Sequence, residues 1–199
     1  MRRLDLIVGP NGAGKSTFVE QRLAPLLPGS VFVNADVIAK DRWPDAAEEH
    51  SYEAARVAAT TRDALIERGE SFIAETVFSH PSKLELIDRA RRAGFVVVLH
   101  VVLVPVELSV ARVAERVVEG GHSVPEAKIR ERFERLWSLV VDAIGRADHA
   151  TVYDNTAPDV TRIIARFVDG DPVGEIAWPA WTPADLVHFK GAVDIADGC

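Results

Sequence analysis

The segment that most clearly predicts chemistry covers residues 9–16, which fit the pattern G-x-x-x-x-G-K-[ST] without a gap. Glycines let such a loop curl so that its N–H groups point at phosphate oxygens, and a following helix adds its positive dipole end. The alternative is a glycine turn that happens to precede a lysine. We expect a phosphate site made by Gly9, Pro10, Asn11, Gly12, Ala13, Gly14, Lys15, Ser16 and the next residue, Thr17.

This loop predicts a nucleotide ligand together with a metal ion. Lys15 is expected to bridge the β- and γ-phosphates, and the hydroxyl of Ser16 to ligate Mg²⁺. The motif alone does not separate ATPases, GTPases and small-molecule kinases. ATP and Mg²⁺ are the predicted cofactors, and GTP stays open because no base-specific contact can be read from the sequence.

A second group of polar residues, Asn34 and Asp36, follows a predicted strand at residues 31–33. The carboxyl ends of parallel strands meet at one edge of a sheet, where the phosphate loop also opens. There Asp36 is a candidate general base that accepts the proton of an attacking hydroxyl, and a candidate metal ligand, while Asn34 is a candidate substrate contact. The alternative is that Asp36 only caps a helix.

A third group, Glu75 and Thr76, ends the predicted strand at residues 71–74 in the same way. Glu75 is expected to hold a metal-bound water or a substrate hydroxyl, and Thr76 and Ser79 add hydroxyl groups for substrate binding. The alternative is an exposed glutamate at a strand end. Because the predicted strand at residues 95–104 does not end in an acid, the metal must rely on Ser16 with Asp36 or Glu75.

Basic residues follow in a segment of about residues 107–135, which we expect to form a hinged lid. Arg112 and Arg116 are four residues apart on one helical face, and Gly120-Gly121 supplies the hinge before His122. Such a lid would bring positive charge to the transferring phosphate and exclude water. The alternative is that interleaved glutamates pair with these arginines and that His122 is simply exposed. Two further arginines are candidates for the same role: Arg130 and Arg132.

Short apolar runs alternate with longer helical patterns along the chain, which indicates an α/β domain with a mostly parallel sheet of about five strands between helical layers. Residues 1–199 are expected to form one domain, with a packed extension from about residue 170 whose tryptophans cover a sheet edge or a face of the core. The predicted strands are residues 4–8, 31–33, 71–74, 95–104 and 151–153. The predicted helices are residues 14–23, 45–68, 81–93, 107–119, 125–146 and 158–168.

Composition narrows the function classes. The 199 residues include 23 basic and 30 acidic ones, for a net charge of −7, which argues against binding nucleic acid or an anionic membrane by bulk charge. A locally basic pocket stays open. The one cysteine, Cys199, favours a reducing compartment, and we expect a cytoplasmic protein because neither a signal peptide nor a membrane-spanning run is apparent.

Several segments together resemble the zeta toxin family of P-loop kinases. They are GPNGAGKST (residues 9–17), NADVIA (34–39), FIAETVFS (72–79), RVAERVVEGGHSVPEAKIRERFERL (112–136) and VYDNT (152–156). The resemblance implies a P-loop kinase-like fold and transfer of phosphate from ATP to the 3′-hydroxyl of UDP-N-acetylglucosamine. It also implies a helical antitoxin that blocks the nucleotide site.

By this resemblance Asp36 is the catalytic base, Lys15 the P-loop lysine, and Glu75 with Thr76 the sugar-binding strand end. Arg116 or Arg112 is the first of two phosphate-contacting arginines. The second lies near His122 or is one of two later arginines, Arg130 and Arg132.

The leading functional hypothesis is an ATP- and Mg²⁺-dependent kinase that phosphorylates a hydroxyl of a small molecule. UDP-N-acetylglucosamine is the first choice of acceptor. A kinase of another small metabolite or of a polynucleotide 5′-hydroxyl is the first alternative. An alternative of another class is a nucleotide-gated regulatory protein with slow hydrolysis.

Overall fold

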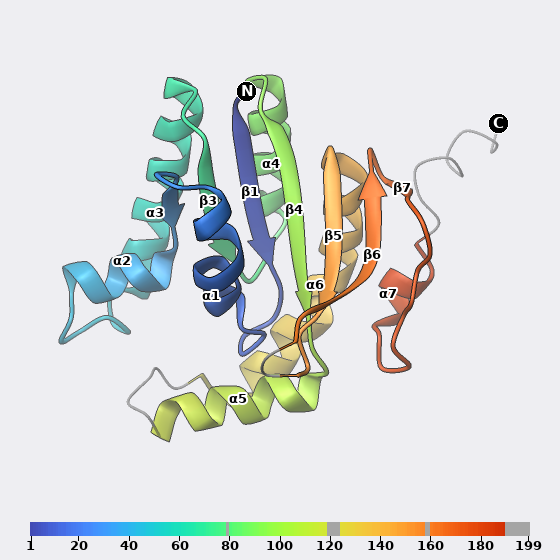
Figure 1. Cartoon of the computed structure of the whole chain (residues 1–199). Coiled ribbons are helices and arrows are strands. Elements are labelled where there is room, and N and C mark those ends of the chain that lie inside the picture. Colours follow the sequence, from blue (N-terminus) through green and yellow to red (C-terminus); the bar gives the residue numbers. More distant parts are fainter. Residues whose placement is uncertain (79, 119–123, 158–159, 190–199) are drawn as a thin grey trace.

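The computed structural model describes residues 1–78, 80–118, 124–157 and 160–189. Seven strands form one sheet in the order β2-β3-β1-β4-β5-β6-β7 (Figure 1). The first five of these pair in parallel, and β6 and β7 pair antiparallel at one edge. The strands are β1 (Arg3–Val8), β2 (Val31–Val33), β3 (Phe72–Thr76), β4 (Val96–Leu103), β5 (His149–Asp154), β6 (Arg162–Val168) and β7 (Asp171–Pro172).

Helices cover both faces of the sheet, so the α/β fold predicted from the sequence is confirmed. On one face, Phe18 and Val19 pack against β1, β3 and β4; on the other, α3, α4 and α6 pack on the large core. The helices are α1 (Lys15–Phe18), α2 (Ala35–Arg42), α3 (Ser51–Arg68), α4 (Ser82–Arg92), α5 (Val106–Val118), α6 (Glu126–Arg146) and α7 (Ala184–Val187). A π-helical turn η1 (Val19–Leu23) and a 3₁₀ turn η2 (Ala24–Leu26) continue α1.

The central strands are apolar almost throughout because they are covered on both faces. In β1, Leu4, Leu6 and Val8 enter the core beneath α4 and α6, while Ile7 enters the core beneath α1. All four side chains are fully buried. β1 therefore fixes the phosphate loop that follows it to the centre of the sheet.

The predicted helix at residues 158–168 is wrong, because the chain forms β6 there (residues 158–159 lie outside the described part). β6 pairs antiparallel with β5, and a register shift falls next to Val152 and Tyr153. The buried residues Ile164, Ala165 and Phe167 have a spacing that also fits a helix face. Isoleucine, valine and phenylalanine prefer strands. The unpaired edge of β5 offers main-chain hydrogen bonds to this segment, which therefore forms a strand.

Two other differences concern where elements begin and how many there are. The helix predicted at residues 45–68 begins at Ser51, after turns, although it ends at Gly69 as predicted. The sheet has seven strands instead of about five because β6 and β7 extend it. In the extension after residue 170, Trp178 and Trp181 pack against the large core.

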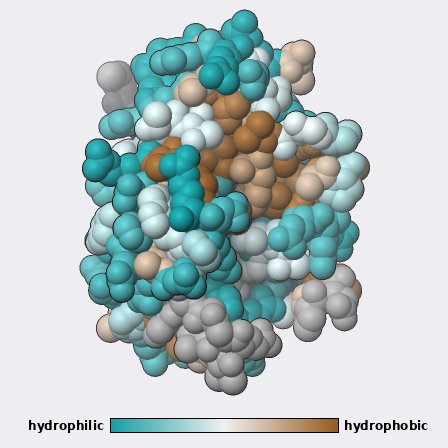
Figure 2. Space-filling view, turned by 90° about the vertical axis from the view of Figure 1, so that its left-hand side faces the viewer, coloured by the Kyte–Doolittle hydropathy of each residue, from teal (hydrophilic) through white to brown (hydrophobic). Residues whose placement is uncertain are grey.

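The opposite edge of the sheet is β2, which lies beside α2 and α3 (Figure 1). From that side, the surface shows a hydrophobic area among hydrophilic residues (Figure 2). Val31 of β2 and Val37 of α2 are among the exposed large hydrophobic residues. None of the described helices combines the length and apolar character needed to span a membrane.

A polar network crosses the buried sheet between β1 and β4. Asp5 is 1% exposed; its Oδ1 lies 2.9 Å from His100 Nε2, and its Oδ2 accepts a hydrogen bond from Arg3 Nε at 2.7 Å. His100 Nδ1 lies 3.2 Å from the hydroxyl of Tyr153. Burial acts to raise the pKa of Asp5, but the hydrogen bonds from His100 and Arg3 outweigh it and lower the pKa.

We expect Asp5→Asn to lower the free energy of unfolding at pH 7 by about 1–3 kcal/mol, because the hydrogen bonds from Arg3 and His100 lose their charged acceptor. A carboxyl with a lowered pKa in the folded state stabilises the protein above its unfolded pKa of about 3.9, and this contribution is lost as the pH falls through the folded pKa. Urea unfolding at several pH values should therefore show the difference between variant and parent shrinking toward pH 3.

The exposed residue Asp45 provides the control, since Asp45→Asn should change the unfolding free energy little at any pH. A difference between Asp5→Asn and the parent that stays constant from pH 7 to pH 3 would contradict the role given to the Asp5 carboxylate.

Candidate active site

The loop between β1 and α1 has a conformation that requires its glycines. Gly12 and Gly14 have φ values of 71° and 82°, in the left-handed region that side chains disfavour. A Cβ at Gly9 would lie 2.3 Å from the carbonyl oxygen of Val102 in β4, so the loop also passes close to the neighbouring strand. This conformation is the physical basis of the phosphate site that we propose for residues 9–16.

Lys15 begins α1 and is buried, 7% exposed. Its Nζ donates a hydrogen bond of 2.8 Å to the carbonyl oxygen of Pro10, across its own loop. Burial lowers the pKa of Lys15, and the nearby carboxylates of Glu75 and Asp36 only partly oppose this effect. The ammonium group is thus held over the loop. There it could exchange the Pro10 oxygen for a phosphate oxygen as its hydrogen-bond acceptor.

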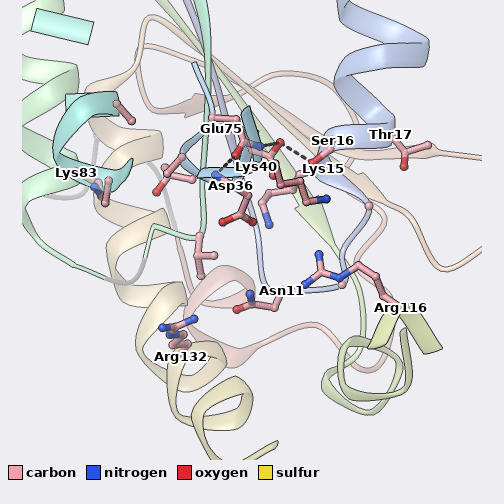
Figure 3. A pocket seen from close by; sticks show the side chains of 18 of the residues that line it. Asn11, Lys15, Ser16, Thr17, Asp36, Lys40, Glu75, Lys83, Arg116 and Arg132 are labelled. Carbon is pink, nitrogen blue, oxygen red and sulfur yellow. Dashed lines mark hydrogen bonds between the residues drawn. The ribbon is translucent and has the colours of Figure 1, made fainter. Parts of the chain in front are cut away.

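Glu75, in β3, links the first turn of α1 to the residue that caps α2. Its Oε2 accepts hydrogen bonds from Ser16 Oγ at 2.8 Å and from Asn34 Nδ2 at 2.7 Å (Figure 3). Glu75 is opposite Ile7 in the parallel register of β1 and β3. The strand that supplies the acid beside the phosphate loop is therefore β3.

Asn34, rather than Asp36, caps α2. The Oδ1 of Asn34 accepts hydrogen bonds from the main-chain nitrogens of Asp36 and Val37, at 2.7 Å and 3.4 Å. The alternative in which Asp36 serves as the helix cap is thus wrong. Asp36 lies in the first turn of α2, and its carboxylate faces the cavity between Lys83 on one side and Lys15 on the other (Figure 3).

The oxygen donors of Ser16 and Glu75 fit a magnesium ion. Hydroxyl and carboxylate oxygens are the ligands that Mg²⁺ prefers, and it commonly takes only one or two protein ligands, with phosphates and waters completing the shell. Within the described residues, no three His, Cys, Asp or Glu side chains form a metal cluster. A metal shared with a nucleotide suits this donor set better than an all-protein cage.

The side chains of Lys15, Ser16, Asp36 and Glu75 line one cavity of about 630 Å³. Seven of its lining residues are basic and two are acidic, although the whole chain carries a net charge of −7. The cavity therefore concentrates positive charge where anionic ligands would bind. The charged lining residues are Lys15, Lys40, Arg62, Lys83, Arg112, Arg116, Arg132, Asp36 and Glu75.

The structure separates the arginines that the sequence grouped together. Arg116 and Arg132 line the cavity from α5 and α6 (Figure 3). Arg112 also lines it, but its guanidinium donates to the main-chain oxygens of Asn155 at 3.0 Å and Thr156 at 3.1 Å, so it fastens the loop after β5.

Arg130 does not line the cavity. It forms ion pairs with Glu107 and Glu126, each at 2.8 Å. For Arg130 the structure thus shows the arrangement of the alternative, in which interleaved glutamates pair with the arginine.

The other predicted residues divide into three groups. Asn11, Thr17 and Thr76 line the cavity. Gly9, Pro10 and Ala13 shape the loop from behind, where all three are buried. The Gly120-Gly121 hinge and the candidate substrate residues Ser79 and His122 lie outside the described residues.

Sequence reasoning missed the residues that hold the phosphate loop from outside. Asn155 Nδ2 donates to the carbonyl oxygen of Ala13 at 2.7 Å, and its Oδ1 accepts from Thr161 Oγ1 at 2.9 Å. The hydroxyl of Ser109 donates to the carbonyl oxygen of Asn11. Asn155 stands in the VYDNT segment, which was the one signal that could have drawn attention to it.

The family model described as zeta toxin matches residues 2–163. The chain belongs to the zeta toxin family. No curated protein sequence matches it.

Solved structures agree with the fold of this zeta toxin family member. The AvrRxo1-ORF1:ORF2 complex with ATP has a TM-score of 0.68 at 20% identity, covering 88% of this chain and 61% of that one. The PezAT toxin–antitoxin system of Streptococcus pneumoniae has a TM-score of 0.61 at 12% identity, covering 83% and 72%. A protein from Chloroflexus aurantiacus described as a candidate kinase has a TM-score of 0.54 at 19% identity, covering 68% and 80%.

The chain spans about three fifths of the AvrRxo1 protein that it matches. At these identities the structures establish the P-loop kinase-like fold, and the family match adds the relation to zeta toxins.

The contact of Asn155 with the loop predicts that Asn155→Ala weakens ATP binding about 2–10-fold, since one hydrogen bond that holds the loop is lost. Isothermal titration calorimetry with a nonhydrolysable ATP analogue measures the change. Thr161→Ala, which removes only the support of Asn155, should have a smaller effect in the same direction. Unchanged binding in Asn155→Ala would show that the loop holds its shape without this contact.

Proposed function

We propose that the chain is an ATP- and Mg²⁺-dependent kinase that phosphorylates a hydroxyl group of a small molecule. The observation that carries this proposal is the position of Asp36. Asn34 takes over the helix cap, so the carboxylate of Asp36 is exposed in the same cavity as Lys15 and Ser16. A carboxylate across a cavity from a phosphate loop is the arrangement that hydroxyl phosphorylation requires.

In the proposed mechanism, the loop amides and Lys15 bind the β- and γ-phosphates of ATP. Asp36 accepts the proton of the acceptor hydroxyl while the hydroxyl oxygen attacks the γ-phosphorus. The bond between that phosphorus and the oxygen bridging it to the β-phosphate breaks, so that ADP leaves and the phosphate monoester forms. Transfer is promoted mainly by positioning and by fixed positive charge.

Ser16 and Glu75 would hold the magnesium ion, which on binding would offset negative charge on the phosphates. Arg116 and Arg132 line the same cavity and would contribute further positive charge. Arg112 would contribute indirectly, because its guanidinium holds the loop after β5 through the main-chain oxygens of Asn155 and Thr156.

UDP-N-acetylglucosamine is the acceptor that we propose. Family membership supports this choice, and the cavity offers Asn34 and Thr76 as polar contacts for a sugar. Ser79 and His122 stay candidates for the same role. A sugar nucleotide and ATP are both cytoplasmic metabolites, so we propose that the protein acts in the cytoplasm.

We also propose an antitoxin partner. The family includes toxins, and the similar PezAT structure is described as a toxin–antitoxin system. A partner that covered the cavity would block the nucleotide site that we assign to residues 9–16.

We expect Asp36→Asn to reduce phosphate transfer by about 10²–10⁴-fold while ATP binding stays within about twofold, because the variant lacks the base but keeps the loop. The assay incubates the protein with ATP, Mg²⁺ and UDP-N-acetylglucosamine, and mass spectrometry detects a sugar nucleotide that has gained one phosphate. Asp41→Asn is the matched control, because Asp41 is exposed on the same helix and does not line the cavity.

Full transfer by Asp36→Asn would contradict the assignment of the base. Phosphorylation of other hydroxyl compounds but not of UDP-N-acetylglucosamine would support the kinase activity and contradict the proposed acceptor. ATP consumption that is independent of every acceptor would favour the nucleotide-gated regulatory protein instead.

A further inference from the structure

Arg62 is a buried cation that the proposed phosphate chemistry does not use. It lies on α3, is 7% exposed and lines the cavity. Its side chain forms no hydrogen bond or ion pair with another described residue. The neighbouring carboxylate, Asp63, is already paired with Arg89.

A second cation, Lys83, lines the cavity from the first turn of α4. Its side chain is likewise without a hydrogen bond or ion pair to any residue that the structure describes. Burial lowers the pKa of Lys83, and the positive charge of Arg62 lowers it further. The two cations line the same cavity, where their like charges oppose each other.

A buried arginine and a half-buried lysine that share a cavity, neither of them paired with a carboxylate of the described residues, are unfavourable in the ligand-free protein. Removing a charge from water is unfavourable unless a partner compensates for it, and buried arginines are normally paired. A ligand that carries negative charge would relieve both the burial and the repulsion. A guanidinium also binds phosphate or carboxylate through two parallel hydrogen bonds.

The subsite lies on the acceptor side of the cavity. Lys83 is separated from Lys15 and Ser16 by Asp36 (Figure 3). Small and apolar residues of α3 and of the segment after β3 also line the cavity: Ala55, Ala58 and Val77. An anionic group at Lys83 would thus leave room for the rest of the acceptor to reach Asp36.

We propose that Arg62 and Lys83 form an anion subsite that holds a phosphate or carboxylate group of the phosphoryl acceptor. The acceptor is accordingly a hydroxyl compound that already carries negative charge, and the subsite orients its hydroxyl toward Asp36. This inference rests on the proposed kinase function. It adds the substrate class and the two residues that select it.

The first test compares acceptors that carry an anionic group with neutral counterparts that lack it. UDP-N-acetylglucosamine is paired with N-acetylglucosamine for phosphate, and gluconate with glucose for carboxylate. We expect the parent protein to phosphorylate an anionic member and not its neutral counterpart. Arg62→Gln and Lys83→Gln should each raise the KM for that acceptor about tenfold or more, with the KM for ATP changed less than twofold.

Arg56→Gln and Arg92→Gln are the matched controls, because these arginines are exposed on α3 and α4 and do not line the cavity. Both should keep the parent's KM values. Arg62→Lys retains the charge and should recover part of the lost affinity, which a loss of folding would not allow. Equal use of neutral and anionic acceptors, or unchanged KM in both glutamine variants, would overturn the subsite.

The second test does not depend on finding the acceptor. Calorimetry measures the binding of inorganic pyrophosphate to the protein whose nucleotide site is saturated with a nonhydrolysable ATP analogue. We expect binding that weakens about tenfold or more in Arg62→Gln and Lys83→Gln but not in Arg56→Gln. Such binding without any phosphorylated product would support the anion subsite and contradict the proposed kinase activity. Phosphorylation without this binding would support the kinase activity and contradict the anion subsite.

Discussion

One carboxylate oxygen joins the parts of the chain on which the proposed chemistry depends. Glu75 Oε2 accepts hydrogen bonds from Ser16, in the helix that follows the phosphate loop, and from Asn34, which caps α2. The same Asn34 side chain fixes the main chain of Asp36. The loop, the proposed metal ligand and the proposed base are thus positioned by three connected hydrogen bonds at one edge of the sheet.

The order of the strands makes this connection possible. β3 lies between β2 and β1, and all three run parallel, so their carboxyl ends meet at the same edge. The apolar residues of β1 are buried on both faces, which prevents the register from slipping. A packing constraint in the core is therefore what places Glu75 beside Ser16.

Electrostatics divides the cavity into two regions. On one side Lys15 is held over the phosphate loop, and on the other Lys83 lies beyond Asp36. The chain is acidic as a whole, yet most charged residues that line the cavity are basic. Anionic ligands would be attracted into the cavity and repelled elsewhere, which suits a small charged substrate better than a polynucleotide.

The sequence predicted the parts of the fold that depend on local patterns. Residues 9–16 could be read because loop shape and phosphate chemistry require these residue types at these positions. The five parallel strands could be read from their apolar runs. Segment 158–168 could not, because its spacing fits a helix face and only the open edge of β5 makes it a strand.

The contacts that complete the site join residues that are distant in the sequence. Asn155 reaches Ala13 across 142 positions, and Arg62 is an ordinary helical arginine until the fold buries it in the cavity. Between Asn34 and Asp36, the sequence could not decide which side chain caps α2. That choice depends on main-chain geometry at the helix start.

A crystal structure with a nonhydrolysable ATP analogue and Mg²⁺ tests the central claim most directly. The account predicts that the triphosphate lies in the loop of residues 9–16, that Lys15 Nζ leaves the Pro10 oxygen for a phosphate oxygen, and that the terminal phosphate faces Asp36. A nucleotide bound elsewhere, or a terminal phosphate that points away from Asp36, would contradict it.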